Sequence, residues 1–348
     1  MRRLLALLVL LPLAAMAQET QQKVGETITV ERIIIDTRVT DDRGDPILNL
    51  AASDFRVKID GKPAAVESVL WVPETAAYRD MADVEAPQVE VNTGTGSPTP
   101  RGRLLVFLFQ TDFARNSVRT NGQMKVLIYA EKLVNNLDPE DRVAVLSYDS
   151  RLKFRLDFSG DPDEIMETCR RSLLVDDPPE PQIVPLPSLS RSFNRDDARN
   201  ATSPEMALTV LANALRPIPG PKSLILFGWG LGTYSAGRVV MGRDYTIARR
   251  VLESARVSVF SMDFTAADYH TLAAGMAVAA ADTGGFYAST HNFPQLAIDK
   301  LQKTLAGHYE LEVRKPPTSA KGYHTIEVTV ARRNANVLAR SSYVDKGE

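Results

Sequence analysis

The sequence predicts an α/β protein: a doubly wound, mainly parallel six-stranded sheet, plus a small all-β domain formed by N- and C-terminal strands. Between residues 102 and 307, short apolar runs alternate with helix-like segments, the order that gives a parallel sheet covered by helices on both faces. Residues 24–75 and 308–348 instead alternate apolar and polar side chains, as strands with one buried face do. With 44% hydrophobic and 24% charged residues, the composition is that of globular domains.

Residues 1–17 have the features of an export signal. Arg2 and Arg3 precede an apolar run over residues 4–15, and Ala15-Met16-Ala17 offers small residues at a cleavage site. The apolar run is shorter than a membrane-spanning helix requires, although a signal anchor is the alternative interpretation. We expect an exported protein, periplasmic or extracellular, that has no transmembrane segment after cleavage.

The N-terminal β domain is expected over residues 24–75. Its predicted strands lie over residues 27–41, 55–59 and 66–72. The second strand ends at Asp60-Gly61, a pair that is typical of a two-residue hairpin turn. Residues 76–101 contain few large apolar side chains and end in glycine, serine, threonine and proline, so a linker is predicted there.

The α/β domain is expected over residues 102–307. Its predicted strands lie over residues 103–109, 142–148, 152–158, 223–227, 257–262 and 285–288. Its predicted helices lie over residues 124–137, 162–174, 205–215, 244–255, 266–282 and 293–305. In the first helix, Met124, Leu127, Ile128, Val134 and Leu137 are predicted to share the core face. Residues 175–204 are rich in proline and charge, so an irregular excursion is expected there.

The tail, residues 308–348, returns to strand-like alternation. Strands are expected over residues 309–313, 326–330 and 337–343. Three such strands cannot bury a face by themselves. They either join the N-terminal strands or pack on the α/β domain, and we predict that they complete the N-terminal β domain.

Composition also restricts the function. The net charge of -2 argues against nucleic acid or an anionic membrane as the main partner. Cys169 is the only cysteine, so no intrachain disulfide can form, and its helix-like surroundings indicate a buried structural thiol. Clustered histidine and cysteine ligands for a metal are not found in the sequence. We expect no cofactor.

A binding site is expected at the loops that follow the buried strands. In open doubly wound sheets, ligands bind beyond the carboxyl ends of the strands. Gln110, Thr111, Asp112, Phe113 and Ala114 follow the first core strand. Residues 228–232, which include Trp229, follow the strand at residue 223, and Asp263 follows the strand at residue 257.

Several segments carry a family resemblance. The order of elements, the stretch Asp141-Arg-Val-Ala-Val145 and the stretch Leu224-Ile-Leu-Phe-Gly-Trp-Gly230 resemble a von Willebrand factor type A (VWFA) domain. The flanking stretches Ser53-Asp-Phe-Arg-Val-Lys-Ile-Asp-Gly-Lys62 and Tyr323-His-Thr-Ile-Glu-Val-Thr-Val330 resemble the secreted VWFA-related family abundant in Acidobacteria. The resemblance covers nearly all of the chain after residue 17. It implies a protein-binding or adhesion-type module.

The resemblance also implies a metal-ion-dependent adhesion site, which holds Mg²⁺ through hard oxygen ligands. The family places Asp, Ser and Ser after the first strand and a second Asp after the fourth. This chain has Gln110, Asp112 and Ala114 at the first three positions and Trp229 at the last. A register that starts at Asp112 leaves Ala114 and Asn116 at the serine positions.

A loop threonine completes the family's metal site, and Thr202 or Ser203 is the candidate for that position. Together with Asp112 these residues are the only metal-ligand candidates, too few to offset the cost of dehydrating Mg²⁺. We therefore expect a degenerate site that holds no metal. A metal-dependent adhesion protein with a non-standard Mg²⁺ site is the alternative.

The predicted function is non-enzymatic binding of a protein or peptide partner. The predicted contact residues are Gln110, Thr111, Asp112, Phe113 and Trp229, although Trp229 could instead fill the space of the lost metal. A structural component of an envelope assembly is a second alternative. A nucleotide-dependent enzyme is a third, since Gly228, Gly230 and Gly232 follow a strand, but the third glycine comes one position early for a dinucleotide site. Four scattered histidines and no nucleophile motif argue against a hydrolase.

Overall fold

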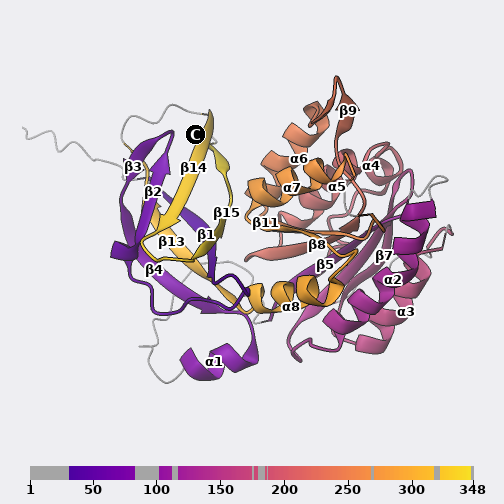
Figure 1. The fold of residues 1–348 in the computed structure, drawn as a ribbon, viewed down its shortest axis with the longest axis horizontal. Coiled ribbons are helices and arrows are strands. Elements are labelled where there is room, and N and C mark those ends of the chain that lie inside the picture. The colour runs from indigo at the N-terminus through magenta and orange to yellow at the C-terminus, as the bar shows by residue number, and fades with distance from the viewer. Residues whose placement is uncertain are drawn as a thin grey trace, which may run out of the picture. The chain divides into compact units, whose positions relative to one another are not determined.

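The computed structural model describes residues 31–82, 102–111, 117–174, 176–178, 185, 187–267, 270–316 and 322–345. The predicted signal peptide, most of the predicted linker, and Asp112 and Phe113 lie outside these residues. Within the described part of the chain there are one six-stranded sheet, two four-stranded sheets and a two-stranded hairpin (Figure 1). None of the described helices has the length and apolar character that a membrane crossing requires.

The six-stranded sheet has the order β12-β11-β8-β5-β6-β7. Its strands are β5 (Leu104–Gln110), β6 (Arg142–Tyr148), β7 (Leu152–Ser159), β8 (Lys222–Gly228), β11 (Val257–Asp263) and β12 (Tyr287–Ser289). All neighbours pair in parallel except β7, which runs antiparallel to β6 at one edge. The prediction of a doubly wound, mainly parallel six-stranded sheet is confirmed.

Helices cover both faces of this sheet (Figure 1). One face carries α2 (Ser117–Val134), α3 (Pro162–Ser172) and α8 (Pro294–Thr304), and the other carries α5 (Pro204–Leu215), α6 (Arg243–Ser254) and α7 (Ala273–Thr283). Strand β5 lies at the centre of the sheet, and this position explains why its apolar run is continuous. Leu104, Val106 and Leu108 enter one core, and the residues between them enter the other.

Two helix predictions were wrong in detail. In α2 the predicted core residue Val134 is buried and Leu127 packs against the core, but Ile128 is 63% exposed. The rest of the core face is formed by Val126, Tyr129, Ala130 and Leu133. Helix α7 begins at Ala273 rather than at residue 266. The segment before it is a loop, because the Asp263 carboxylate accepts a hydrogen bond from the backbone N–H of Thr265 and draws the chain into a turn.

The N- and C-terminal strands form one β domain of two packed sheets. The first sheet has the order β15-β1-β13-β4 and the second the order β16-β14-β2-β3. Their strands are β1 (Arg32–Thr40), β2 (Phe55–Ile59), β3 (Lys62–Ala64), β4 (Val66–Pro73), β13 (Gly307–Arg314), β14 (Gly322–Val330), β15 (Asn336–Ala339) and β16 (Ser342–Asp345). Because β1 pairs with β13 and β2 pairs with β14, the prediction that the tail completes the N-terminal domain is confirmed.

The inner faces of the two sheets bury a shared core. Ile35, Leu311 and Val313 from the first sheet meet Val57 and Ile326 from the second. The predicted hairpin at Asp60-Gly61 is present as a two-residue turn between β2 and β3, and both turn residues have positive φ. The single strand predicted over residues 337–343 is instead two strands, β15 and β16, which belong to different sheets.

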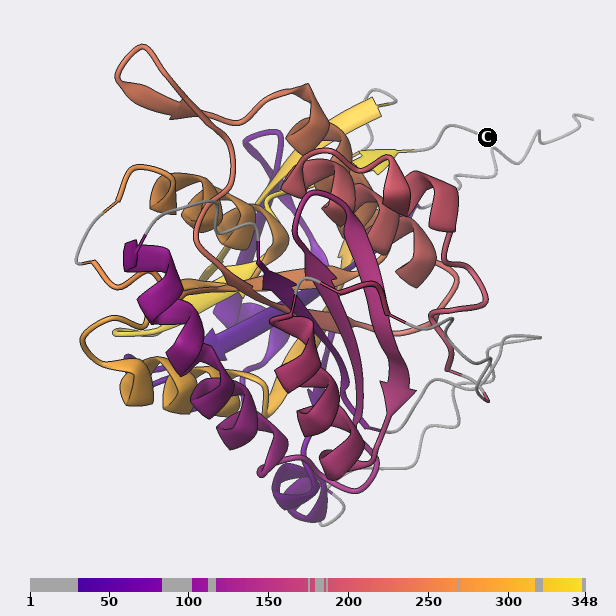
Figure 2. The same cartoon turned by 90° about the vertical axis from the view of Figure 1, so that its right-hand side faces the viewer.

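The segments between the core elements hold more structure than the sequence indicated. Helix α1 (Ala76–Ala82) lies at the start of the predicted linker, and the short helix α4 (Arg195–Arg199) lies within the predicted excursion. A hairpin of β9 (Thr233–Ser235) and β10 (Arg238–Val240) follows the loop after β8 and projects from the neighbouring helices (Figures 1 and 2). This hairpin was not predicted.

Candidate functional site at the carboxyl edge of the sheet

Gln110 joins the two central strands at the edge where the family resemblance places a metal. It is the last residue of β5, and its side chain is only 2% exposed. The amide oxygen Oε1 accepts hydrogen bonds from the backbone N–H groups of Trp229 at 3.0 Å and Gly230 at 3.3 Å. A side chain at Gly228 would lie 2.8 Å from the same oxygen, so this close approach requires glycine. Gln110 thus fixes the loop after β8.

Thr111 and Trp229 lie at the same edge. The backbone N–H and the hydroxyl of Thr111 both donate to the carbonyl oxygen of Tyr148, at 2.6 and 3.2 Å, which ties β5 to the end of β6. Trp229 is partly exposed and packs against the core between the sheet and helices α2, α3 and α8. The structure therefore brings Gln110, Thr111 and Trp229 together, while Asp112 and Phe113 lie outside the described residues.

The remaining metal candidates are engaged in other contacts. Ser203 is the N-cap of α5, and its hydroxyl accepts a hydrogen bond from the backbone N–H of Met206 at 3.2 Å. Thr202 is exposed, and its hydroxyl lies 3.6 Å from the sulfur of Met206. The buried Glu205 carboxylate on α5 accepts a hydrogen bond from the backbone N–H of Gly232 at 2.6 Å.

These residues do not fit a Mg²⁺ ion. Mg²⁺ needs several oxygen ligands arranged around it, and at least one or two carboxylates to offset dehydration. The first family position holds a neutral amide whose oxygen already accepts two hydrogen bonds, and the last holds an indole that offers no oxygen. None of the described candidates, Gln110, Thr202, Ser203 and Trp229, is a carboxylate.

A second group of polar side chains lies at the end of β11. The Asp263 carboxylate is almost fully buried, lies 2.5 Å from Nε2 of His270, and accepts a hydrogen bond from the Tyr287 hydroxyl at 2.8 Å. Burial, with the nearby Asp263 charge, raises the pKa of Tyr287, so the phenol remains a donor. Asp263 was noted from the sequence, but His270 and Tyr287 were missed because they are 7 and 24 residues away from it.

Among the described residues, this aspartate–histidine pair has no nucleophile bonded to it. A hydrolase needs a nucleophile hydrogen-bonded to its base. Within the described part of the chain, the polar contact of His270 is to Asp263, and no serine, threonine or cysteine side chain bonds to its ring. The pair instead fixes the loop before α7. Cys169 is fully buried, as the sequence predicted, and burial raises the pKa of its thiol to about 12.

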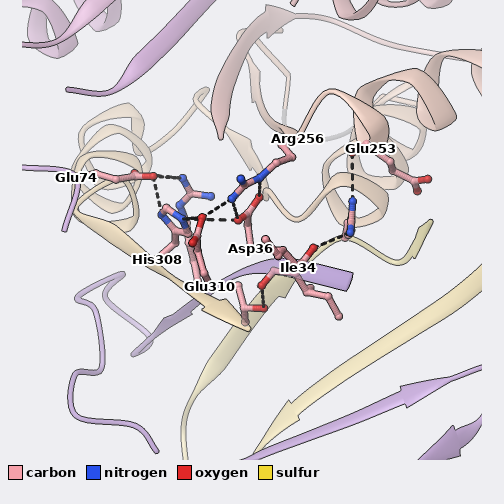
Figure 3. Close-up of polar contacts among 11 residues, drawn as sticks. Ile34, Asp36, Glu74, Glu253, Arg256, His308 and Glu310 are labelled. Carbon is pink, nitrogen blue, oxygen red and sulfur yellow. Dashed lines mark hydrogen bonds and ion pairs between the residues drawn. The ribbon is translucent and has the colours of Figure 1, made fainter. Parts of the chain in front are cut away.

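A further polar cluster lies between the β domain and the α/β domain (Figure 3). Among the described residues, Asp36, His308 and Glu310 form the one group of His, Cys, Asp or Glu side chains whose ligand atoms lie within 4.8 Å of one another. The guanidinium of Arg256 already occupies this group, because it pairs with both Asp36 and Glu310. The cluster is therefore a set of ion pairs and not a metal site.

Comparisons with known proteins find similar solved structures. No protein-family model matches the chain, and no curated protein is similar to it. Among solved structures, a von Willebrand factor type A protein from Catenulispora acidiphila is similar with a TM-score of 0.41 and 10% identity, covering 92% of this chain and 76% of that one. The human COPII-coat protein Sec24c has a TM-score of 0.39 and 12% identity, covering 71% of this chain and 44% of that one.

Proximal thread matrix protein 1 from the mussel byssus, solved with a zinc-occupied adhesion motif, has a TM-score of 0.39 and 13% identity and covers 59% of this chain. This chain spans less than half of the length of Sec24c and of the mussel protein. The strand order β12-β11-β8-β5-β6-β7, with helices on both faces of the sheet, carries the fold class.

Proposed function

We propose that this chain is an exported, non-enzymatic protein-binding module that contacts a protein or peptide partner through the loops at the carboxyl edge of its six-stranded sheet, without a metal ion. The hydrogen bonds of the Gln110 amide oxygen are the observation that carries the proposal. At the position where the family holds its first metal ligand, an uncharged amide accepts hydrogen bonds from the loop that carries Trp229. The edge is therefore organised by hydrogen bonds within the protein.

Trp229 gives this edge an aromatic contact residue. Its ring is partly exposed, and tryptophan is enriched among the residues that dominate protein interfaces. Beside it, the Gln110 amide oxygen and the Thr111 hydroxyl are paired within the chain. Among the described residues, the polar contact of the His270 ring is to Asp263 and not to a serine, threonine or cysteine, which favours binding over catalysis. The basic start and the apolar run over residues 4–15 favour export.

The proposal is tested by partner capture with Trp229→Ala in a buffer that contains EDTA. We expect the immobilised wild-type chain to retain a partner from the envelope fraction despite the chelator, and the variant to retain about tenfold less, as loss of an interface hot spot implies. The melting temperature should change little. Leu70→Ala, an exposed apolar side chain in the β domain, is the control and should retain the partner fully. Loss of capture in EDTA, or a large loss of stability in Trp229→Ala, would contradict the proposal.

A further inference from the structure

The hairpin of β9 and β10 continues the loop that carries Trp229. It joins the end of β8, at the carboxyl edge of the sheet, to the start of α6, and it projects from the neighbouring helices (Figures 1 and 2). Its base is held at Gly232, whose backbone N–H donates to the buried Glu205 carboxylate at 2.6 Å. Gly232 has φ +81°, a conformation that favours glycine. The hairpin is therefore a projecting arm with a fixed base beside the proposed contact edge.

Large and charged side chains of this hairpin are exposed. Tyr234 is 58% exposed and Val240 is 39% exposed. Arg238 is also exposed, and among the described residues no ion pair or hydrogen bond engages its guanidinium. Tyrosine and arginine are enriched among the residues that dominate protein interfaces. The side chains of the arm thus have the composition of a contact surface.

Strand β9 also has an unpaired backbone edge. Its neighbour in the two-stranded sheet is β10, with Ser235 opposite Arg238 and Tyr234 opposite Val239. When a two-residue turn closes a hairpin, the pair next to the turn exchanges both hydrogen bonds, and the following pair points its N–H and C=O groups outward. The backbone groups of Tyr234 therefore point away from β10. Within the described part of the chain, no backbone group outside the hairpin bonds to them, so the edge is open to a further strand.

The two faces of the hairpin differ in chemistry. Tyr234 lies on one face, where its exposed ring would lie directly beside an added strand. Ser235 and Arg238 lie on the other face. Because Ser235 is small and stands between Arg238 and the open edge, the guanidinium can extend across β9 to an added strand. An apolar side chain suits the first face, and an acidic side chain suits the second.

We propose that the β9 edge binds an extended segment of the protein partner, in which acidic and apolar side chains alternate, as an added antiparallel strand. Backbone hydrogen bonds to Tyr234 hold this strand, an acidic side chain pairs with Arg238, and apolar side chains pack on the Tyr234 ring. The inference rests on the proposed function, because the hairpin continues the partner-binding edge, and it names the chemistry of the partner. A second copy of the chain suits the edge less well, since joining two copies through β9 would bring like-charged Arg238 side chains to one sheet.

The probe is a short blocked peptide in which valine and glutamate alternate, and its match has lysine in place of glutamate. In calorimetric titration of the full chain, we expect saturable binding of the glutamate peptide and at least about tenfold weaker binding of the lysine peptide, as loss of a charge-assisted hydrogen bond implies. N-methylation of the valines should abolish binding, because the valine opposite Tyr234 shares its face and exchanges both backbone hydrogen bonds with it. N-methylation of the glutamates, whose N–H groups point away from β9, is the control.

A charge reversal on the hairpin separates recognition from folding. Arg238→Glu should reverse the preference, so that the lysine peptide binds more tightly than the glutamate peptide. A structural disturbance would weaken both peptides and would not reverse their order. Arg250→Glu makes the same change at an exposed arginine of α6 and is the control, which should keep the preference for glutamate.

Three results would overturn the inference: equal binding of the two peptides, an unchanged preference in Arg238→Glu, or sedimentation that shows self-association of the chain lost in Tyr234→Ala. The last result would identify a second copy as the occupant of the edge. Failure of the peptides while Trp229-dependent partner capture persists rejects the added strand and leaves the proposed function standing. Binding of the glutamate peptide without partner capture in EDTA supports the β9 site and counts against the proposed function.

Discussion

At the scale of single residues, the Gln110 side-chain amide joins the end of β5 to the loop after β8. Glutamine is one methylene longer than asparagine and aspartate, so its amide oxygen reaches the backbone N–H groups of the neighbouring loop. A buried backbone N–H that loses its acceptor costs free energy comparable to that of a lost hydrogen bond. Gln110 therefore stabilises the loop that presents Trp229.

Replacing Gln110 by alanine tests this role. Two N–H groups of the loop lose their acceptor, so we expect the free energy of unfolding to fall by about 1–3 kcal/mol. Urea denaturation measures the change. Thr202→Ala is the control, because Thr202 is exposed, and it should change the free energy of unfolding by less than about 0.5 kcal/mol. A loss in Gln110→Ala no larger than in the control would show that the loop does not depend on this amide.

At the scale of elements, periodicity predicted the buried strands well. A strand covered on both faces must be apolar at every position, so β5, β6 and β8 are visible as continuous apolar runs. The hairpin at Asp60-Gly61 was visible because turns with positive φ select particular residues. Helix faces were less predictable, as Ile128 shows, because they depend on contacts with elements far away in the sequence.

The candidate site was predictable only in part, for the same reason. The fold class alone identified the edge of the sheet and therefore Gln110, Thr111 and Trp229. Nothing in the sequence indicated that the Gln110 amide bonds to a loop that comes 119 residues later. The pairing of Asp263 with His270 and Tyr287 was hidden in the same way. Side-chain partners are set by tertiary structure, which periodicity does not report.

Residues 188–190, before α4, are held by a single buried side chain. The buried Asp157 carboxylate accepts hydrogen bonds from the Ser188 hydroxyl at 2.7 Å and from the backbone N–H groups of Leu189 at 2.6 Å and Ser190 at 3.1 Å. Asp157→Asn replaces one acceptor oxygen by a donor, so this segment should detach locally.

Hydrogen exchange measures this change. We expect the Leu189 and Ser190 amides to exchange at least about tenfold faster in Asp157→Asn, while the amides of β5 keep their protection. Asp196→Asn, on the exposed face of α4, is the matched control. Unchanged exchange at Leu189 would mean that the apolar contacts of this segment hold it without Asp157.

At the scale of the whole molecule, ion pairs join the β domain to the α/β domain. His308 is 0% exposed, and its Nδ1 lies 2.8 Å from Oε1 of Glu74. Burial lowers the pKa of His308, but the Glu310 and Glu74 carboxylates outweigh it and raise the pKa to about 9. With His308 protonated, three cations (Arg38, Arg256 and His308) face three carboxylates (Asp36, Glu74 and Glu310), and the cluster is neutral (Figure 3).

The pH dependence follows from that pKa. A histidine whose pKa is raised on folding stabilises the fold fully below its unfolded value of 6.5 and loses that contribution as pH rises through about 9. We expect His308 to contribute about 3 kcal/mol near pH 6 and little above pH 10, from the size of the shift. Lys222 changes stability with pH in the opposite direction, because burial lowers its pKa to about 7. The free energy of unfolding is therefore compared between wild type and His308→Gln at each pH.

The measurement is urea denaturation of both proteins from pH 6 to pH 10. The difference in the free energy of unfolding should shrink steadily as pH rises, since only the wild type loses a proton from this position. A difference that stays constant over this range would show that folding does not raise the pKa of His308.

The central proposal is that the α/β domain presents the carboxyl edge of its sheet without a metal, and calorimetric titration of the full chain with Mg²⁺ and Mn²⁺ tests it most directly. The account predicts no saturable heat and no change in melting temperature up to millimolar metal, because Gln110 and Ser203 are engaged within the protein and Trp229 offers no oxygen ligand. Saturable binding at micromolar metal that is lost in Asp112→Ala would contradict the claim and indicate a non-standard adhesion site.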